Sequence, residues 1–308
     1  MLINQAGSGA GIRHVAWFYR TPAEYLAAIE EFVRAGLASE EPVLVAVPQD
    51  QLPRDWTLPA GSSVTMADMA VVGRNPARVI PLLAAFCTRH HGQRIRYLGE
   101  PAWCGRSDAE LQEAARHEAL LNLAFADAQI TIFCPYSALL PQAVIAEARS
   151  THPSVRTNGS ESASPGYLGP TEYLAKLDRL LPVPASAQTL EYARDLRPVR
   201  AVVAAVAERA GLPSARCTDL VIAASEVAAN TLRHTGAAGT VRLWSTEREV
   251  LCQFEDTGVI TDPLAGHRRP AGDLPGGQGL WLVNQLCDLT EIRTGDLGTI
   301  VRLHMDRP

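Results

Sequence analysis

The chain has 308 residues, with 28 Lys or Arg, 33 Asp or Glu and a formal net charge of −5. This length predicts about two domains, and 47% hydrophobic residues are ample for two cores. The negative charge argues against a sequence-independent nucleic-acid binder, and the six cysteines lack the Cys-x-x-Cys spacing of zinc ribbons and thioredoxins.

Residues 12–150 alternate strand-like and helix-like patterns. We expect strands at 14–19, 42–47, 63–66, 95–100 and 129–134, and helices at 22–37, 76–90 and 107–123. Thr21 and Pro22 form a helix start, and Ser107 with Glu110 forms a capping box. This alternation predicts an α/β domain with a mostly parallel sheet and helices on both faces.

Polar and aromatic side chains fall at the ends of these strands. Ligands bind at the carboxyl ends of the strands in open α/β sheets. We therefore predict a sensory pocket that includes Tyr19, Glu100 and Cys134, with His14 and His117 as polar partners. Two alternatives stay open: the two histidines are hydrogen-bonded structural residues, or His14, Glu100, His117 and Cys134 hold a metal ion.

This half resembles the MEDS sensory domain, first recognised in methanogen and methylotroph regulators. The resemblance rests on four segments: His-Val-Ala-Trp-Phe-Tyr at 14–19, Gly-Glu-Pro at 99–101, Arg-His-Glu at 116–118 and Cys-Pro-Tyr at 134–136. It implies a RecA-like core and an unidentified small-molecule ligand. Because the phosphate-binding pattern G-x-x-x-x-G-K-[ST] does not occur, we expect no ATP hydrolysis here.

A stretch rich in Pro, Gly and Ser follows at 151–170, a short helix is expected at 171–181, and Pro182-Val183-Pro184 makes a stiff approach to the next domain. The predicted organisation is a sensory domain over 1–155, a linker over 156–187 and a second domain over 188–308.

The second domain begins with a helix pattern over 191–212, and a helix over 225–235 follows it. Glu226 and Asn230 are four residues apart, so the second helix places both on one face. An amide oxygen suits Mg²⁺, and a carboxylate can orient or deprotonate a nucleophile. Alone, such a pair is more often ordinary surface, and the segments that follow decide its meaning.

These segments come in a fixed order. A strand-like run from Val250 closes at Asp256-Thr257-Gly258, Gly276-Gly277-Gln278-Gly279 precedes an apolar helix at 280–286, and a last strand carries Gly298-Thr299. Glycines let a backbone approach phosphate closely, and a helix start offers free N–H groups to an anion. A glycine-rich turn is weak evidence by itself, but the whole order is far more specific.

That order resembles the Bergerat (GHKL) ATP-binding fold of gyrase, Hsp90, histidine kinases and MutL, over about residues 188–308. The resemblance implies an α+β sandwich that binds ATP and Mg²⁺. It implies that Glu226 is the catalytic acid or base, that Asn230 binds Mg²⁺ and that Asp256 receives the adenine amino group. The remaining implied ATP-binding residues are Gly258 beneath the base, Gly276, Gly277 and Gly279 in the phosphate lid, Thr299 at the adenine end and Arg233 near the phosphates.

The subfamily follows from what precedes this domain. No histidine occurs between Leu168 and Leu220, where a histidine kinase carries its phosphoacceptor, and His117-Glu118 lies far upstream. With its short lid, the domain looks most like the RsbW-type anti-sigma factor serine/threonine-protein kinases. This resemblance implies a sigma factor and an anti-anti-sigma (STAS-type) protein as partners, and allows a homodimer.

Three rivals stay open. The protein is an orphan sensor histidine kinase, a non-catalytic switch that uses ATP only to shape a partner surface, or an enzyme whose chemistry lies in the N-terminal half. No apolar run of about eighteen residues and no signal-peptide pattern occur, so we expect a cytoplasmic protein without direct contact with membrane or nucleic acid.

Overall fold

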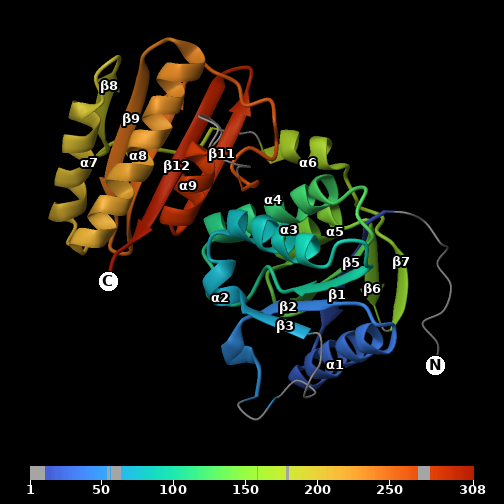
Figure 1. The fold of residues 1–308 in the computed structure, drawn as a ribbon. Coiled ribbons are helices and arrows are strands. Elements are labelled where there is room, and N and C mark those ends of the chain that lie inside the picture. The colour runs from blue at the N-terminus through green and yellow to red at the C-terminus, as the bar shows by residue number, and fades with distance from the viewer. Residues whose placement is uncertain (1–10, 54–55, 57–63, 158, 178–179, 270–277) are drawn as a thin grey trace. The chain divides into compact units, whose positions relative to one another are not determined.

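The computed structural model describes residues 11–53, 56, 64–157, 159–177, 180–269 and 278–308. They form two compact units, each with its own sheet (Figure 1). The first unit includes the described residues up to Val71, with Leu82–Arg106 and Ala114–Tyr173; the second includes Val72–Pro81, Ser107–Glu113 and those from Leu174 onward. Within these ranges, no helix has the length and apolar character needed to cross a membrane.

The first unit contains a seven-stranded sheet in the order β3-β2-β4-β5-β1-β6-β7. All neighbours pair in parallel except β6 and β7, which are antiparallel. The strands are β1 (Arg13–Tyr19), β2 (Val43–Val47), β3 (Val64–Asp68), β4 (Ile95–Gly99), β5 (Ile130–Ser137), β6 (Ser154–Thr157) and β7 (Ser160–Ala163). The predicted parallel α/β sheet is thereby confirmed.

Helices cover both faces of this sheet, with α1 (Pro22–Ala38) on one face (Figure 1). The other face carries α3 (Val79–Arg89), α4 (Asp108–Ala124) and α5 (Gln142–Thr151). The shorter elements are η1 (Gln49–Gln51), α2 (Met69–Val72), η2 (Pro76–Arg78) and α6 (Pro170–Leu177).

The predicted helix starts are confirmed by their hydrogen bonds. Thr21 accepts one from the Glu24 N–H at 3.2 Å and so caps α1. In the capping box of α4, Ser107 Oγ accepts from the Glu110 N–H at 3.3 Å, and Glu110 accepts from the Ser107 N–H at 2.7 Å. Each bond satisfies a backbone donor that has no partner inside the helix.

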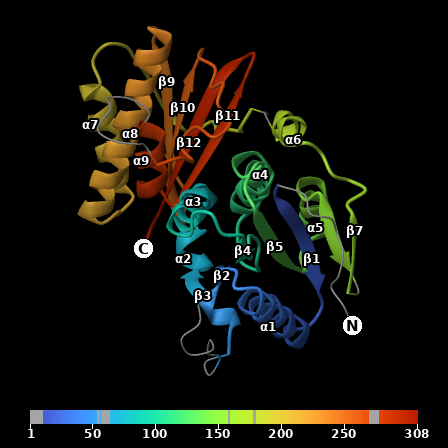
Figure 2. The same ribbon diagram turned by 45° about the vertical axis from the view of Figure 1, so that its right-hand side comes forward.

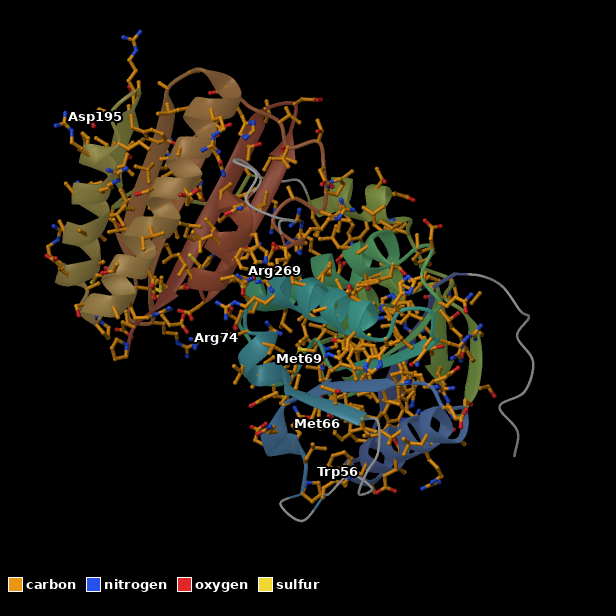
Figure 3. All side chains as sticks on the ribbon, viewed as in Figure 1. Trp56, Met66, Met69, Arg74, Asp195 and Arg269 are labelled. Carbon is orange, nitrogen blue, oxygen red and sulfur yellow. The ribbon has the colours of Figure 1, made fainter. Side chains whose placement is uncertain are left out.

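An apolar cluster joins α1 to its face of the sheet. Ile29 on α1 and Val45 and Leu98 on the strands are completely buried in it. Trp56 and Met66 pack at its edge (Figure 3). The strands read as nearly continuous apolar runs because both of their faces are covered.

The second unit contains a five-stranded antiparallel sheet in the order β11-β12-β10-β9-β8. Its strands are β8 (Gln188–Tyr192), β9 (Gly239–Ser245), β10 (Glu249–Asp256), β11 (Leu289–Gly295) and β12 (Gly298–Asp306). The helices α7 (Arg197–Arg209), α8 (Ser214–Thr235) and α9 (Gly279–Leu286) lie on one face of the sheet (Figure 2). This two-layer arrangement is the predicted α+β sandwich.

A buried apolar core lies between these two layers. Val227 and Ala228 of α8 are buried in it, and Leu232 packs at its edge. The ends of the helices are also set by local chemistry. Gly236 ends α8 in the left-handed conformation with φ 64°, and Asp195 (Figure 3) accepts a 3.0 Å hydrogen bond from the Arg197 N–H at the start of α7.

Two expectations from the sequence need correction. The helix pattern over 191–212 is wrong at its start, because Glu191 belongs to β8 and pairs with Thr240 of β9. Arg194, with φ 53°, follows the strand and α7 starts only at Arg197. The breaker-rich stretch at 151–170 contains β6 and β7, which extend the first sheet. The predicted domain boundaries and the RecA-like likeness stay predictions.

Candidate functional site

The second unit contains a pocket of about 490 Å³, a volume typical of small-molecule sites. It is bordered by α8, the end of β10 with the loop after it, the start of α9 and β12. The lining residues are Val227, Asn230, Thr231, His234, Thr235, Asp256, Gly258, Val259, Ile260, Thr261, Asp262, Leu264, Ala265, Gly266, Arg268, Gly279, Leu280, Thr299 and Val301.

Asp256 is held on both of its carboxylate oxygens. Thr231 donates a hydrogen bond of 2.7 Å to Oδ2, and the Gly258 N–H donates one of 2.8 Å to Oδ1. Behind Thr231, the Tyr192 hydroxyl donates to Thr231 Oγ1 at 3.0 Å. Burial raises the pKa of Tyr192 to about 12, so it remains a donor at neutral pH. Tyr192 thus donates to Thr231, and Thr231 in turn donates to Asp256. Both hydroxyl groups are therefore oriented toward the carboxylate.

Thr299 closes the turn beside Asp256. Its hydroxyl donates to the Gly258 carbonyl at 2.8 Å, and its oxygen lies 3.0 Å from Thr294 Oγ1. Gly298 has φ +109°, and a Cβ there would lie 2.0 Å from the Asp256 carbonyl oxygen. Only glycine lets the two backbones approach this closely.

The start of α9 lies directly against the polar face of α8. A Cβ on Gly279 would come within 3.0 Å of both Glu226 Oε2 and Asn230 Nδ2. Arg233 Nη1 donates a hydrogen bond of 2.8 Å to Asn230 Oδ1. Glu226, Asn230 and Arg233 thus form one polar group beside a helix N-terminus, where free N–H groups favour an anion.

The structure brings most of the predicted ATP-site residues together. Asn230, Asp256, Gly258, Gly279 and Thr299 line the one pocket. Glu226 lies beside the pocket, next to the lining residue Gly279. Arg233 also lies beside it and donates a hydrogen bond to the lining residue Asn230. Gly276 and Gly277 lie outside the described residues. The roles assigned to all of these residues remain predictions.

Sequence reasoning missed several residues of this site. Thr231 directly follows Asn230 and so sits one helical step away from the residue that was singled out, and Tyr192 lies in the strand that was read as helix. His234 and Arg268 also line the pocket. The position of Thr231 in the recognised helix was the available signal, but nothing in the sequence linked Tyr192 to it.

In the first unit, the five predicted sensory residues fall into two sets of contacts. Tyr19 donates to Glu100 at 3.0 Å, and Tyr25 donates to the other oxygen of Glu100 at 2.6 Å. Burial raises the pKa of Glu100 to about 7, although these two hydrogen bonds oppose the shift. His14 instead has its Nε2 atom 3.5 Å from Cys134 Sγ, on the face of the sheet that α4 covers.

His117 belongs with the second set, since its Nε2 lies 3.9 Å from Glu118 Oε1. Its burial lowers its pKa to about 4, so the ring is neutral at pH 7. The described part of this unit also contains a pocket of about 480 Å³, which includes Trp17, Phe18, Arg20, Arg149 and Arg156 in its lining. None of the five predicted residues lines it.

Two family models match the chain. The model of the methanogen/methylotroph DcmR sensory domain, MEDS, matches residues 13–153. The model of the histidine kinase-like ATPase domain matches residues 190–305, which include the pocket around Asp256. The chain is therefore a signalling regulator that combines an N-terminal MEDS domain with a C-terminal kinase-like ATPase domain of the GHKL type.

Among solved structures, the chain is similar to the RsbU and RsbW domains of Rv1364c from Mycobacterium tuberculosis. The identity is 22%, the match covers 39% of this chain and 33% of that chain, and the TM-score of 0.30 is too low to carry a structural argument. A search of the curated proteins finds no significant match.

Proposed function

We propose that the ATPase domain binds ATP with Mg²⁺ and transfers the γ-phosphoryl group to a serine or threonine of a partner protein. The MEDS domain would control this reaction through a small ligand. One observation carries the proposal: a carboxylate fixed on both oxygens, Asp256, shares one pocket with Asn230 and with the glycine that begins α9.

The adenine end of the nucleotide would lie at Asp256. A carboxylate is an acceptor only, so it suits the exocyclic amino group of adenine and would repel the carbonyl oxygen that guanine carries there. Thr231 and the Gly258 N–H hold the carboxylate before any ligand arrives, which lowers the entropy lost on binding. Val259, Ile260 and Leu280 supply apolar contact for a base.

The phosphates and Mg²⁺ would lie at the polar face of α8. Asn230 Oδ1 is the kind of oxygen ligand that Mg²⁺ prefers. Arg233 now donates to Asn230 Oδ1, so Mg²⁺ would displace this bond and free the guanidinium for the phosphates. The N-terminus of α9, beside Gly279, would offer backbone N–H groups to phosphate oxygens.

The transfer would then follow the usual in-line route. The partner's hydroxyl oxygen forms a bond to the γ-phosphorus while the bond from that phosphorus to the ADP oxygen breaks. Glu226 would orient the hydroxyl and receive its proton, and Mg²⁺ would neutralise the charge left on ADP.

The partners that fit this proposal are a sigma factor and a small anti-anti-sigma (STAS-type) protein. Two sequence features support them: the resemblance to RsbW-type kinases and the lack of a histidine between Leu168 and Leu220. A homodimer and a cytoplasmic location belong to the same proposal.

The chemical stability of the transferred phosphate tests this reading. The full chain is incubated with Mg²⁺, γ-labelled ATP and a protein extract of its source cells, and phosphorylated peptides are identified by mass spectrometry. We expect acid-stable phosphate on a serine or threonine of a small protein. The Glu226→Gln variant should lose this transfer but still bind ATP.

Three other results would each contradict a part of the proposal. Acid-labile phosphate on a histidine of this chain would favour a histidine kinase. ATP binding with normal partner capture but no transfer would favour the non-catalytic switch. If ATP does not bind at all, the nucleotide site itself is refuted.

A further inference from the structure

Four side chains with metal-binding atoms meet inside the first unit, and we call them the buried polar cluster. They are His14 on β1, Glu118 on α4, Cys134 on β5 and His152 at the end of α5. None is more than 2% exposed. One ligand atom from each lies within 4.8 Å of the others.

The fold explains why these residues meet. Strands β1 and β5 pair in parallel with Ala16 opposite Cys134, so His14, two residues before Ala16, points to the same face of the sheet as Cys134. Helix α4 covers that face and directs Glu118 toward both side chains. The cluster therefore links two strands and two helices in the core of the unit.

The hydrogen bonds around His14 fix its protonated nitrogen. Asn122 donates through Nδ2 to two backbone carbonyls, Glu118 O at 3.1 Å and Thr151 O at 2.8 Å. Carbonyls only accept, so the amide orientation is fixed and Asn122 Oδ1 faces His14 Nδ1 at 3.0 Å. Nδ1 of His14 therefore carries hydrogen.

The same reasoning applies to His152. Its Nδ1 lies 2.7 Å from the Ala148 carbonyl oxygen, so this nitrogen also carries hydrogen. The Nε2 atoms of His14 and His152 both lie 3.0 Å from Glu118 Oε2. The His152 Nε2 makes no hydrogen bond of normal geometry, despite this short distance and complete burial.

This arrangement needs positive charge between its acceptors. In their neutral forms, both imidazoles direct a lone pair toward Glu118 Oε2, and among the four side chains only the Cys134 thiol, a weak donor, gives this oxygen a hydrogen bond, at 3.2 Å. Such an arrangement is unfavourable for a buried carboxylate. A divalent ion resolves the conflict. Together with the carboxylate, a Cys134 thiolate and two neutral imidazoles, it gives a site with no net charge.

We propose that His14, Glu118, Cys134 and His152 bind a tetrahedral divalent transition-metal ion, with Zn²⁺ as the best fit. Imidazole, thiolate and carboxylate are the usual Zn²⁺ ligands. Zinc bond lengths of about 2.0 to 2.3 Å place tetrahedral ligand atoms roughly 3.3 to 3.7 Å apart. Cys134 Sγ lies 3.2 Å from Glu118 Oε2 and 3.5 Å from His14 Nε2, so these two pairs need little adjustment, and all four ligand atoms already lie within 4.8 Å of one another.

The surroundings resemble a formed metal site in a second respect. Metal-binding histidines usually donate their other ring N–H to a carbonyl or carboxylate, which sets the tautomer and the ring orientation. Asn122 Oδ1 and the Ala148 carbonyl provide this contact for His14 and His152. With four protein ligands and no open position, the ion would stabilise the sensory domain and would not activate a substrate.

The cluster differs from the metal site considered from the sequence. Glu100 is bound by Tyr19 and Tyr25 and is not part of it. Glu118 takes its place as the carboxylate. His152 replaces His117 as the second imidazole.

The test uses the untagged full chain, produced in medium that contains either Zn²⁺ or Co²⁺, so that the ion can enter during folding. We expect about one metal equivalent per chain by elemental analysis. The Co²⁺ form should show the visible bands of tetrahedral cobalt and a sulfur-to-metal charge-transfer band. The Cys134→Ser variant should lose the charge-transfer band, whereas Cys104→Ser, at an exposed cysteine, should keep it.

A second pair of variants tests the histidine ligand. His152→Gln should bind less than half of the wild-type metal, and His91→Gln, at an exposed histidine, should bind as much as the wild type. Circular dichroism reports whether each variant folds. The wild type decides the question even if a ligand variant does not fold. A folded wild-type chain with no stoichiometric metal, or with Co²⁺ but no thiolate charge-transfer band, overturns the proposal. The four side chains would then be held together by hydrogen bonds alone.

Discussion

The Thr231 hydroxyl donates a 2.7 Å hydrogen bond to Asp256 Oδ2 and itself accepts one from Tyr192. Thr231 is 2% exposed, so water cannot easily replace this bond. The carboxylate that would recognise adenine is thus oriented by α8, next to the residue that would bind Mg²⁺. The two ends of the proposed nucleotide site are linked by consecutive residues, Asn230 and Thr231.

Replacement of Thr231 by Val tests this link. The variant keeps the shape of the side chain but removes the donor to Asp256, and hydrogen bonds to charged groups contribute about 1.5 to 3 kcal/mol. We expect ATP binding, measured by calorimetry, to weaken by about tenfold or more. The control is Thr218→Val on the exposed side of the same helix, and equal affinities for the two variants would refute the role of Thr231.

Gly279→Ala tests the contact between α9 and the polar face of α8. A methyl group there meets Glu226 and Asn230 at 3.0 Å, so these side chains must shift from their present positions. We expect weaker Mg²⁺-dependent ATP binding with little change in thermal stability. Gly295→Ala, which meets nothing within 4 Å, is the matched control, and normal Mg²⁺-dependent binding by Gly279→Ala would contradict the assignment.

Gly298→Ala is expected to destabilise the ATPase domain. The Cβ would lie 2.0 Å from the Asp256 carbonyl oxygen, and the φ of +109° is strained for any other residue. We predict a loss of about 2 to 4 kcal/mol in the free energy of unfolding, measured by urea denaturation. If Gly298→Ala lowers the free energy of unfolding no more than Gly295→Ala does, the backbone at Gly298 can move away from Asp256 at little cost, which would contradict this prediction.

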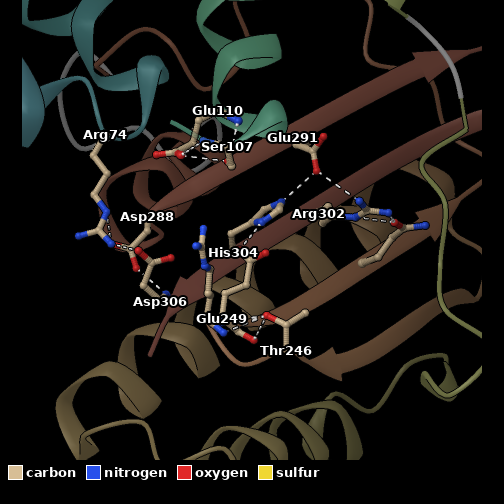
Figure 4. A network of polar contacts seen from close by, with 12 residues as sticks. Arg74, Ser107, Glu110, Thr246, Glu249, Asp288, Glu291, Arg302, His304 and Asp306 are labelled. Carbon is tan, nitrogen blue, oxygen red and sulfur yellow. Dashed lines mark hydrogen bonds and ion pairs between the residues drawn. The ribbon is translucent and has the colours of Figure 1, made fainter. Parts of the chain in front are cut away.

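His304 makes the stability of this domain depend on pH. It lies between Glu249 at 2.8 Å and Glu291 at 2.9 Å (Figure 4). Burial alone lowers the pKa of His304, but the hydrogen bonds with the two carboxylates outweigh burial and raise it to about 9. Because the folded-state pKa exceeds the unfolded value, the stabilisation is complete below about pH 6.5 and is lost as the pH rises through about 9.

The difference between these two pKa values corresponds to ~3 kcal/mol. Urea unfolding of the wild type should therefore show falling stability between about pH 6.5 and about pH 9.5, and His304→Gln should flatten this dependence. If His304→Gln keeps the full pH dependence of the unfolding free energy, this dependence arises from other titratable groups.

Much of the fold could be predicted because periodicity and caps act locally. The strand at 14–19, the capping box at Ser107 and the helix that carries Glu226 all depend on neighbours within a few residues. Strand β8 could not be predicted in this way. Its Glu191 and Tyr192 have helix-compatible neighbours, and only pairing with β9, about fifty residues away, makes them a strand.

The two sites also divide into residues that local sequence patterns predict and residues that only the fold brings together. Asn230, Asp256 and Gly279 were predicted because their spacing matches a known motif, and the structure places them in one pocket. The buried polar cluster was predicted only in part. His14 and Cys134 were singled out, but His152 follows a helix that the sequence did not indicate, so no local pattern connected it to Glu118.

Calorimetry of nucleotide binding tests the central claim most directly. The full chain is titrated with ATP and with GTP in the presence and absence of Mg²⁺, in parallel with Asp256→Asn and Asn230→Ala. We predict Mg²⁺-strengthened binding of ATP in preference to GTP, loss of binding in Asp256→Asn, and loss of the Mg²⁺ effect in Asn230→Ala. Binding of ATP that is unchanged in Asp256→Asn would contradict the account, because the nucleotide would then lie outside this pocket.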